Sequence, residues 1–478
     1  MSKTIFVSGN FNILHPGHLR LLRFAKELGD KLIVGVHSDE IAESNAHVPE
    51  ELRLEGIHSN SWVDECFLID KPVTDIIREL KPEIVVKGKE HEGEFNPELE
   101  VLEEYGGSLL FSSGEVVFSS LDLIRKDLSS LKTKEFEFPF SFASRHDFEV
   151  SDMIEVLKKM SSSKVCVIGD LIIDEYITCD PLGMSQEDPT IVVTPVDNQK
   201  FLGGAAIVAA HAVGLGAKVD LYSISGNDST RDFATDSLKR LKVNSFILED
   251  QSRPTSLKQR FRSQGKTLLR VSHLHQGSIS SELQDLIFNG LKEKINNYDL
   301  IIFSDFNYGC LPQSLVDKVS SLAVKNKIIQ VADSQSSSQS GDVSRFKGMD
   351  LLTPTEHEAR ISLRNQEDGL VIIAEKLRSD AKASHLLLKL AEEGVLIQYL
   401  DEKKKELKTD RLKAFNKNPI DVAGAGDSML TAAALTLTTG GSFALAAAVG
   451  SFAAAVQVSR IGNLPLNKND LINLLREY

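Results

Sequence analysis

Two blocks of short apolar runs alternate with helical patterns along the chain, and an irregular stretch separates them. The first block has apolar runs at 4–7, 32–36, 83–86 and 108–111 and an amphipathic helical pattern at 18–28. The second block has runs at 165–168, 219–222, 300–303 and 328–331. Strands that alternate with helices favour parallel sheets, which bind ligands at the carboxyl ends of their strands. Since 478 residues exceed one ordinary core, the expected fold class is α/β with two separate sheets.

The domain boundaries follow from the break between the two blocks. We assign residues 1–132 to the first domain and residues 151–478 to the second. The segment 133–150 contains Pro139, several charges and all five phenylalanines of this region, but it has no clear period. We interpret it as a linker that packs partly onto a domain.

Charge and composition exclude several classes of protein. A net charge of −14 argues against a nucleic-acid or anionic-membrane surface, since both need a basic face. The stretch 428–459 carries no charged residue, but the polar run 438–442 divides it, which favours two buried helices over a membrane span. The four scattered cysteines form no C-x-x-C pair, and the N-terminal residues lack the apolar core of a signal peptide. We therefore expect a cytoplasmic protein with reduced thiols and without membrane or nucleic-acid partners.

The first candidate site lies where the strand at 4–7 runs into a loop and then a helix. This loop holds His15 and His18, three positions apart, and the glycines Gly9 and Gly17. Helix N-termini favour phosphate, and imidazoles can donate hydrogen bonds to phosphate oxygens as pyrophosphate leaves. The spacing alone is equally compatible with a capping loop that carries two surface histidines.

Residues 15–18 resemble the H-x-G-H signature of the cytidylyltransferase-like nucleotidyltransferases. Residues 34–39 resemble the family's second strand and S-D turn, residues 85–88 its V-K-G segment, and residues 118–120 its late serine stretch. The resemblance covers residues 3–126 and implies a Rossmann-like domain in which His15 and His18 are catalytic. It implies nucleotide contacts from Gly9, Asn10, Phe11, Gly17, Ser38, Asp39, Lys87, Gly88, Ser119 and Ser120. The nucleotide is ATP or CTP, because this fold serves both bases.

This half also departs from the family pattern. Asn12 stands where the family usually has Asp, and residues 40–47 lack the basic residue that follows the S-D turn. Without that cation the transition state would be less well stabilised, and Arg53 is the candidate substitute. An alternative therefore stays open, in which this half is a degenerate nucleotide-binding regulatory module.

The second candidate site is the small-residue run 421–427, which precedes an apolar helical stretch. Backbone N–H groups at such a helix start form an anion hole, here from Ala423, Gly424, Ala425 and Gly426. Asp427 at its inner edge can take the proton of a sugar hydroxyl that attacks a γ-phosphate. A lone G-x-G-D run is also typical of a glycine-rich turn with an N-capping Asp.

Residues 421–427 resemble the D-T-x-G-A-G-D signature of the ribokinase-like PfkB sugar kinases. Residues 203–209 resemble the family's sugar-binding helix, residues 169–174 its early G-D-x-x-x-D strand, and residues 352–358 its T-P-N-x-x-E segment. The resemblance spans residues 163–465 and implies a ribokinase-like α/β domain with a small β lid that uses MgATP. It implies sugar contacts from Asp170, Asp174, Gly203, Gly204, Lys258 and Arg260. It implies that Glu358 and Asp305 serve magnesium and phosphate, with Glu358 as the Mg²⁺ ligand.

Finer features resemble the heptose 7-phosphate kinases. Residues 253–270 resemble their lid and phosphate-contact region, and residues 185–189 resemble their S-P-E-x-P run. The whole chain thus resembles the bifunctional enzymes of ADP-heptose synthesis, a heptose-7-phosphate kinase joined to a heptose-1-phosphate adenylyltransferase, with the two domains in reversed order. Ile207 replaces a sugar-contacting Asn, Thr355 replaces Asn, and Lys389 replaces a Thr near the nucleotide. These departures leave open another sugar phosphate of a capsule or glycan pathway.

Two segments of the second domain alternate like strands, at 190–196 and 256–269. Related kinases use such strands as a lid over the sugar. Exposed strand edges tend to be covered by a partner, so we expect a homodimer that forms through the lid.

Overall fold

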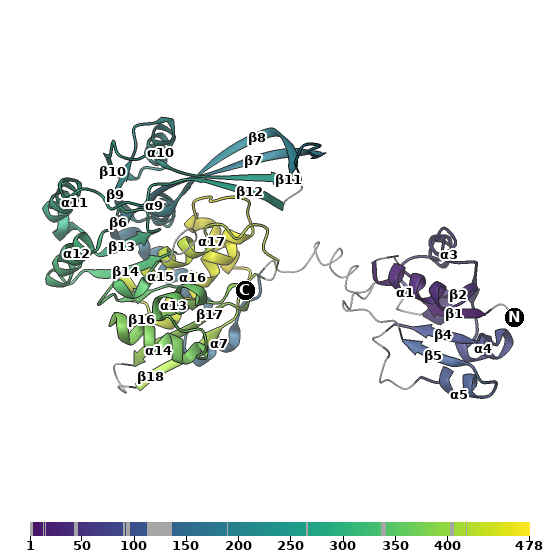
Figure 1. Cartoon of the computed structure of the whole chain (residues 1–478). Helices are drawn as coiled ribbons and strands as arrows, with labels where there is room; N and C mark the ends of the chain where they lie inside the picture. The colour runs from purple at the N-terminus through teal and green to yellow at the C-terminus, as the bar shows by residue number, and fades with distance from the viewer. Residues whose placement is uncertain are drawn as a thin grey trace. The chain divides into compact units, whose positions relative to one another are not determined.

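The computed structural model describes residues 3–12, 14, 16–42, 46–88, 91, 96–111, 136–188, 190–263, 266–335, 341–401, 406–416 and 418–478. The chain divides into two compact units, unit 1 (Met1–Lys134) and unit 2 (Glu135–Tyr478) (Figure 1). Each unit contains its own sheet with helices around it, so the predicted α/β class is confirmed.

Unit 1 is built on a parallel sheet. Within the described residues the strand order is β3-β2-β1-β4-β5. The strands are β1 (Thr4–Gly9), β2 (Lys31–His37), β3 (Glu65–Ile69), β4 (Ile84–Lys87) and β5 (Ser108–Phe111). The helices are α1 (Pro16–Glu27), α2 (Asp39–Ala42), α3 (Glu50–His58), α4 (Val73–Leu80) and α5 (Glu98–Glu103). The strands run outward from β1 to β3 on one side of the sheet and from β4 to β5 on the other, so the direction of the strand order changes between β1 and β4. Open α/β sheets bind ligands at such a point.

The central strand of unit 1 is buried on both faces, which explains its unbroken apolar run. Ile5 and Val7 belong to the same buried cluster as Leu22 of α1. Phe6 points to the other face and belongs to a second cluster with Ile77 of α4. Alternate side chains of a strand face opposite sides, so a strand between two helix layers must be apolar at every position.

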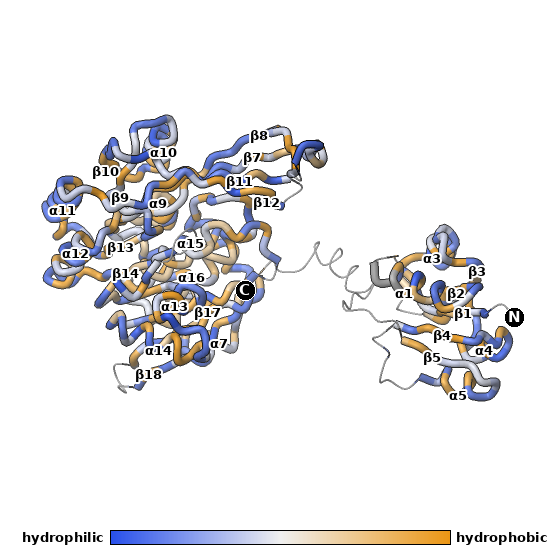
Figure 2. The backbone as a smooth tube through the Cα atoms, viewed as in Figure 1, coloured by the Kyte–Doolittle hydropathy of each residue, from blue (hydrophilic) through white to orange (hydrophobic). Residues whose placement is uncertain are grey.

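Unit 2 contains a larger sheet whose described strands follow the order β10-β9-β6-β13-β14-β15-β16-β17-β18. Their bounds are β6 (Lys164–Gly169), β9 (Lys218–Ser225), β10 (Asn244–Glu249), β13 (Leu300–Asp305), β14 (Ile329–Ser334), β15 (Leu351–Leu352), β16 (His385–Lys389), β17 (Val395–Asp401) and β18 (Glu406–Leu412). Pairing is parallel from β10 to β16 and antiparallel from β16 to β18. Figure 2 shows hydrophobic colour along the strands of this sheet and hydrophilic colour on the outer helices and turns.

A second sheet of unit 2 forms the lid that the sequence predicts. Its described strands are β7 (Leu171–Met184), β8 (Ile191–Gly203), β11 (Ser256–Ser263) and β12 (Lys266–His273), in the order β12-β11-β7-β8. Figure 1 shows them projecting together beyond the helices of this unit. β7 leads directly from the main sheet, so the lid is anchored where β6 ends.

Helices cover both faces of the larger sheet. They are α7 (Phe140–Arg145), α8 (Val150–Lys159), α9 (Gly204–Gly214), α10 (Ser229–Arg240), α11 (Ser281–Lys294), α12 (Gln313–Lys325), α13 (Glu356–Leu363), α14 (Leu370–Ala381), α15 (Ala425–Thr438), α16 (Phe443–Val458) and α17 (Lys468–Leu475). α15 and α16 occupy the uncharged stretch 428–459 and are buried along most of their length, which confirms the predicted pair of core helices. In the described part of the chain, no helix is both long and apolar enough to cross a membrane.

The segment interpreted as a linker lies largely in the core of unit 2. Phe136, Phe138, Phe142 and Phe148 are all buried in the same cluster as α15 and α16. Its helix α7 is also tied to the sheet, since Arg145 pairs with Asp410 of β18 at 3.0 Å. The phenylalanines lack a period because they lie on a short helix and on the irregular residues on either side of it, rather than on one regular element.

We expect residues 1–132 and residues 135–478, expressed separately, each to unfold cooperatively, because each holds its own core. A second version of unit 2 that begins at residue 150 should unfold at a clearly lower temperature. It loses the four buried phenylalanines, and each buried Phe stabilises a fold by roughly 1.5–3 kcal/mol. Circular dichroism during heating measures this difference. Equal midpoints for the two versions of unit 2 would contradict the packing of this segment.

Candidate functional site

A cleft of about 860 Å³ in unit 2 brings together most of the residues predicted for the kinase site. It is lined by residues of α9, β11, the start of α13, the end of β16 and the start of α15. The predicted residues in its wall are Asp174, Gly204, Lys258, Arg260, Glu358, Ala423, Gly424, Ala425, Gly426 and Asp427. Residues from distant parts of the chain meet because the carboxyl ends of parallel strands share one edge of the sheet.

The anion-hole loop is held in a fixed conformation. Gly424 adopts φ 74°, and a Cβ there would lie 2.1 Å from Oδ1 of Asn463, so only glycine fits. The carboxylate of Asp421 accepts hydrogen bonds from the N–H of Ala423 (3.1 Å) and the N–H of Gly462 (3.0 Å). The first turn of a helix leaves its N–H groups without intrahelical partners, and here that turn opens into the cleft. The loop therefore offers a preorganised site for a phosphate oxygen.

Asp427 is the third residue of α15 and is only 5% exposed. Burial, with the nearby charge of Asp333, raises the pKa of Asp427 to about 7. Gly424 occupies the N-cap position of α15 and Asp427 lies in its first turn, so the alternative of Asp427 as the N-cap is wrong. A carboxylate with a pKa near neutrality suits a general base, which must accept a proton during the reaction.

Phosphorylation by this site should therefore depend on pH through Asp427. The base acts only when ionised, so kcat/KM should rise with pH, level off above a midpoint near 7, and fall about tenfold per unit below it. The test is to measure ADP release with saturating MgATP from about pH 5 to pH 9 and to compare its pH dependence with this profile. A rate that stays constant through pH 6 would contradict the role of Asp427 as the base.

The opposite side of the cleft carries charges that suit a phosphorylated sugar. Asp174 pairs with Arg260 (3.3 Å) and accepts a hydrogen bond from Nδ2 of Asn463 (3.2 Å). A Cβ on Gly203 would lie 2.6 Å from Oδ2 of Asp174, so this glycine makes room for the carboxylate without lining the cleft. Lys258 lies two residues from Arg260 on β11, and both side chains line the cleft. One buried carboxylate thus lies beside two cations. The carboxylate can accept hydrogen bonds from sugar hydroxyls, and the cations can bind a phosphate.

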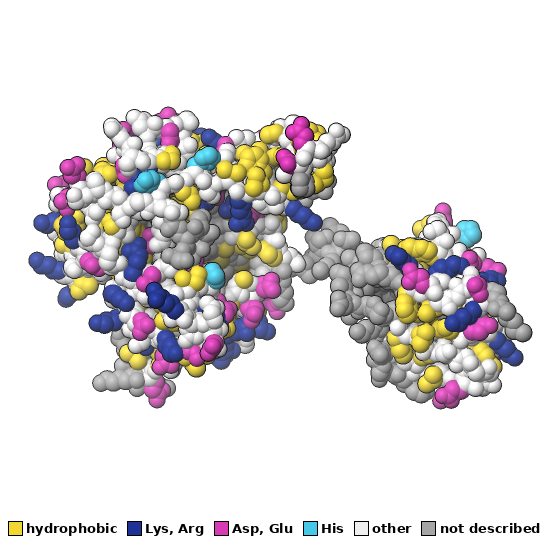
Figure 3. All heavy atoms as spheres, in the orientation of Figure 1, with side chains coloured by type: hydrophobic (Ala, Val, Ile, Leu, Met, Phe, Trp, Pro, Cys, Tyr) yellow, Lys and Arg dark blue, Asp and Glu magenta, His cyan; other side chains and the backbone are white. Residues whose placement is uncertain are grey.

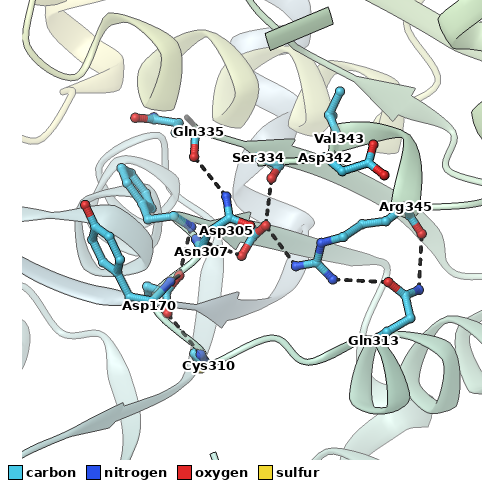
Figure 4. Close-up of polar contacts among 12 residues, drawn as sticks. Asp170, Asp305, Asn307, Cys310, Gln313, Ser334, Gln335, Asp342, Val343 and Arg345 are labelled. Carbon is cyan, nitrogen blue, oxygen red and sulfur yellow. Dashed lines mark hydrogen bonds and ion pairs between the residues drawn. The ribbon is translucent and has the colours of Figure 1, made fainter. Parts of the chain in front are cut away.

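Asp170 and Asp305 are not among the residues that line the cleft, contrary to the roles that the resemblance implied. Figure 4 shows the polar contacts that hold both carboxylates. Asp170 accepts hydrogen bonds from three backbone N–H groups of the loop 306–310. Asp305 pairs with Arg345 at 2.8 Å and accepts a hydrogen bond from the hydroxyl of Ser334 at 2.7 Å. Both carboxylates are almost fully buried. They position the loop after β13, and neither lines the cleft in which a sugar or a magnesium ion would bind.

Glu358 lines the cleft beside the anion hole. One of its oxygens accepts a hydrogen bond from the N–H of Thr355 (2.7 Å), within a capping box that starts α13. The described residues include no group of three or more His, Cys, Asp or Glu side chains placed to hold a metal ion. Mg²⁺ usually takes one or two protein carboxylates together with substrate phosphates and waters. Glu358 fits this pattern for an ion that arrives with the nucleotide.

Some cleft residues were missed by the sequence patterns. Asn463 bonds Asp174 and touches the anion-hole loop, yet it lies 289 positions from Asp174 in the chain. Gln335 lines the cleft and donates to the Asp427 carboxylate at 3.4 Å. No local spacing indicates either residue. Ile207 is fully buried in α9 and does not line the cleft. The sugar contact that the family pattern assigns to an Asn at this position is therefore missing.

In unit 1, the predicted nucleotide residues converge at the carboxyl ends of β1 and β2. Asn10 Oδ1 lies 2.8 Å from His37 Nδ1, which joins the two strand ends. Phe11 adopts φ 46°, a strained value for a residue with a side chain, and its ring meets His18 edge to face at 5.1 Å. The sharp turn at Phe11 thus returns the chain toward α1 with His18 against the loop. Gly17 lies in α1, while His15, Ser119 and Ser120 lie outside the described residues.

Arg53 is a structural residue rather than a substitute phosphate ligand. Its side chain is fully buried, and its guanidinium donates to the carbonyl oxygens of Asn10 (2.8 Å), His37 (2.7 Å) and Val48 (2.7 Å). It also pairs with Asp39 at 2.5 Å. These contacts hold three segments of the site together, and the hypothesis that Arg53 replaces the missing cation is wrong.

Lys87 ends β4, immediately before Gly88, and its ammonium pairs with Glu98 at 3.0 Å. Ser38 accepts a hydrogen bond from the N–H of Ile41 and starts α2. Burial, followed by the charges of Arg53 and Lys87, lowers the pKa of His37, so its imidazole is neutral at pH 7. Lys87 is thus a candidate cation at the reversal between β1 and β4, provided that a phosphate displaces Glu98.

Comparison with known proteins agrees with both resemblances. The family model of the pfkB family carbohydrate kinases matches residues 162–468, and the cytidylyltransferase-like model matches residues 6–135. Two curated relatives are named bifunctional protein HldE. The one from Desulfatibacillum aliphaticivorans is 30% identical over 68% of this chain and 64% of its own length, and the one from Sulfurimonas denitrificans is 31% identical over 66% and 65%. The matched region thus spans just under two thirds of these relatives.

Solved structures confirm the fold of the kinase part. Ribokinase from Thermotoga maritima matches with a TM-score of 0.51 and 19% identity over 66% of this chain and 100% of its own. Phosphofructokinase-2 from Escherichia coli, solved with substrates and products, matches with a TM-score of 0.52 and 16% identity over 66% of this chain and 99% of its own.

Proposed function

The chain belongs to the pfkB family of carbohydrate kinases, and on this basis we propose that unit 2 phosphorylates the anomeric hydroxyl of a sugar phosphate with MgATP. The observation that carries the proposal is the buried carboxylate of Asp427 beside the anion hole in a cleft that also holds Lys258 and Arg260. Asp427 takes the hydroxyl proton as the sugar oxygen attacks the γ-phosphorus, and the bond to ADP breaks. The N–H groups of residues 423–426 stabilise the charge on the transferred group.

Magnesium would be held by Glu358 together with the phosphates of the nucleotide. The ion supplies positive charge that offsets the charge of the triphosphate. The protein groups around it fix geometry: the capping box at Thr355 orients the Glu358 carboxylate toward the cleft wall. Lys258 and Arg260 are proposed to bind the distal phosphate of the sugar, since two cations on one strand face match a phosphate dianion.

For unit 1 we propose nucleotidyl transfer. The oxygen of the sugar 1-phosphate attacks the α-phosphorus of a nucleoside triphosphate, and pyrophosphate leaves. His15 and His18 donate hydrogen bonds to phosphate oxygens at the start of α1. The likeness to the cytidylyltransferase-like model and the position of His18 beside the strained Phe11 turn support this role.

The substrate that fits both reactions best is heptose 7-phosphate, converted to an ADP-heptose. The lid residues Lys258 and Arg260 support a sugar that carries a distal phosphate, and a separate phosphatase must remove that phosphate between the two steps. The adenine base is proposed from the resemblance to the ADP-heptose enzymes, with CTP as the alternative. We propose a cytoplasmic location, since both proposed steps consume nucleoside triphosphates.

A substrate screen tests this proposal. ADP release is measured with MgATP and a panel of heptose, hexose and pentose phosphates. We expect the highest kcat/KM with heptose 7-phosphate and a large loss for the same sugar without its phosphate. Preference for a pentose or hexose phosphate would instead support the same two folds in another glycan pathway, an alternative that the apolar Ile207 favours.

One observation favours a second candidate for unit 1. The buried guanidinium of Arg53 is committed to backbone carbonyls, and sequence positions 40–47 hold no Lys or Arg. Unit 1 would then bind a nucleotide without transferring it. Titration of ATP and CTP into residues 1–132, combined with a pyrophosphate-release assay, separates the two. Binding without pyrophosphate release at any sugar 1-phosphate supports the regulatory module.

The lid supports the proposal of a homodimer. Large apolar side chains are exposed along its outer part, and Figure 3 shows apolar side chains gathered there. They are Leu182, Met184, Ile191, Val192, Val196, Leu268 and Leu269. Monomeric proteins rarely expose large apolar patches. Among the described strands of the lid, β8 and β12 also lie at the two edges of the sheet, where a partner strand could pair.

We expect the protein to sediment as a dimer at micromolar concentration and the double variant Leu182→Asp/Met184→Asp to sediment as a monomer. Two carboxylates in an apolar interface would remain unpaired and would oppose association. Leu286→Asp, at an exposed apolar position of α11, is the matched control and should leave the dimer intact. A monomeric wild type would refute the lid as an interface.

A further inference from the structure

The side chain of Lys389 lines the kinase cleft and is held there by a buried carboxylate. It is the last residue of β16, and its backbone N–H donates to the carbonyl of Pro354 at 2.8 Å. Its side chain is 12% exposed, and the ammonium donates to both carboxylate oxygens of Asp333, at 3.1 and 2.9 Å. Asp333 lies near the end of β14, so two strand ends hold this cation in a fixed position.

The ammonium lies directly against the anion hole. A Cβ built on Gly426 would lie 3.1 Å from Nζ of Lys389, which is closer than most real contacts of a Cβ. Lys389 and Gly426 both line the cleft. The glycine therefore leaves a small space between the hole and the ammonium, and a phosphate oxygen in the hole would be within reach of Nζ.

The surroundings of this cation are acidic. Asp333, Glu358 and Asp427 all act on Lys389, and although burial alone lowers the pKa of its ammonium, these carboxylates raise it above the ordinary value. Lys389 is thus charged at neutral pH. A triphosphate that enters beside three carboxylates needs positive charge, and Lys258 and Arg260 lie on the sugar side, where Arg260 pairs with Asp174.

We propose that Lys389 binds the phosphoryl group in transfer, with Asp333 as the residue that positions its ammonium. This inference rests on the proposed kinase function and adds a residue to its site. As the sugar oxygen bonds to the γ-phosphorus and the bond to ADP breaks, Nζ donates to a non-bridging oxygen of the moving group. The hydroxyl proton goes to Asp427, and Lys389 keeps its own proton throughout.

The test compares wild type, Lys389→Met and the control Lys376→Met in the full chain. Lys376 on α14 forms an exposed ion pair with Asp368 and does not line the cleft. Nucleotide binding is read locally, from hydrogen-exchange protection of peptides covering 353–363 and 420–438. This readout reports the kinase cleft and is independent of nucleotide bound to unit 1. The probes are ADP and the non-hydrolysable analogue AMP-PNP, each with Mg²⁺.

We expect Lys389→Met to weaken AMP-PNP about 10–100-fold, as for loss of a charge-assisted hydrogen bond, and to weaken ADP less than about threefold. Lys376→Met should change neither. Equal AMP-PNP affinity in wild type and Lys389→Met overturns the inference while the kinase function stands, as does an equal loss for ADP and AMP-PNP. Absence of protection in the wild type with either nucleotide overturns the proposed function and this inference together.

A second variant guards against misfolding. Lys389→Met leaves the buried carboxyl of Asp333 without its cation, so the double variant Lys389→Met/Asp333→Asn removes both charges. It should fold with a melting temperature close to that of wild type and should show the same selective loss of AMP-PNP. Full AMP-PNP affinity in the folded double variant overturns the inference.

Discussion

Asp427→Asn is expected to lower the rate of sugar phosphorylation by about 10²–10⁴-fold, because Asn has no basic oxygen to accept the hydroxyl proton. The change is nearly isosteric, so the loop fixed by Asp421 should keep its conformation and bind nucleotide as before. Nucleotidyl transfer by unit 1 should remain unchanged. ADP release with sugar phosphate and MgATP measures the loss, and Asp236→Asn, at an exposed position of α10, is the control.

The stability of this variant distinguishes a base from a structural cap. The folded-state pKa of Asp427 is about 7, above its ordinary value of 3.8, so its ionisation destabilises the native state as pH rises through this window. At pH 8 the neutral Asn should therefore leave the melting temperature equal or raised. A capping Asp would instead lose about 1 kcal/mol of stability with little change in turnover. A lowered melting temperature with near-normal turnover would overturn the catalytic assignment.

His18→Ala is expected to lower nucleotidyl transfer by about 10²–10³-fold, as for the loss of one preorganised donor to a transition-state oxyanion. His18 lies in the first turn of α1, where phosphate is favoured, and it contacts the Phe11 ring. Phosphorylation by unit 2 should continue at the wild-type rate. His15→Ala should behave in the same way. Pyrophosphate release with a sugar 1-phosphate is the assay.

The control for this prediction is His58→Ala, since His58 is exposed at the end of α3. Its loss should leave both activities unchanged. Full transferase activity in the His15 and His18 variants would contradict the site assignment in unit 1. Loss of both activities in one variant would indicate general misfolding, which thermal unfolding of the same samples detects.

Local patterns of the sequence predicted much of this fold. The apolar runs of β1, β2 and β4 are visible because strands buried on both faces are apolar at nearly every position. The uncharged stretch 428–459 became α15 and α16 because alanine-rich helices can pack closely within a core. The tight turn at 421–427 before α15 was also predictable, since its conformation depends on consecutive residues, including a glycine at φ 74°.

Contacts between distant segments could not be predicted in this way. The Arg53 guanidinium bonds three carbonyl groups that only the folded loops bring together. Asp170 and Asp305 follow their strands as sugar or metal ligands would, yet neighbouring loop N–H groups and Arg345 occupy their oxygens. Asn463 reaches the cleft from beyond α16. In each case tertiary hydrogen bonds decide the role of a polar side chain, and spacing along the chain carries no information about them.

The most direct test of the two-reaction account is mass spectrometry of the products. The full chain is incubated with heptose 7-phosphate and MgATP, and separately with heptose 1-phosphate and each of the four nucleoside triphosphates. We predict a heptose bisphosphate with release of ADP in the first reaction, and an ADP-heptose with release of pyrophosphate in the second. Formation of neither product, with heptose or any other sugar phosphate of the panel, would contradict the account.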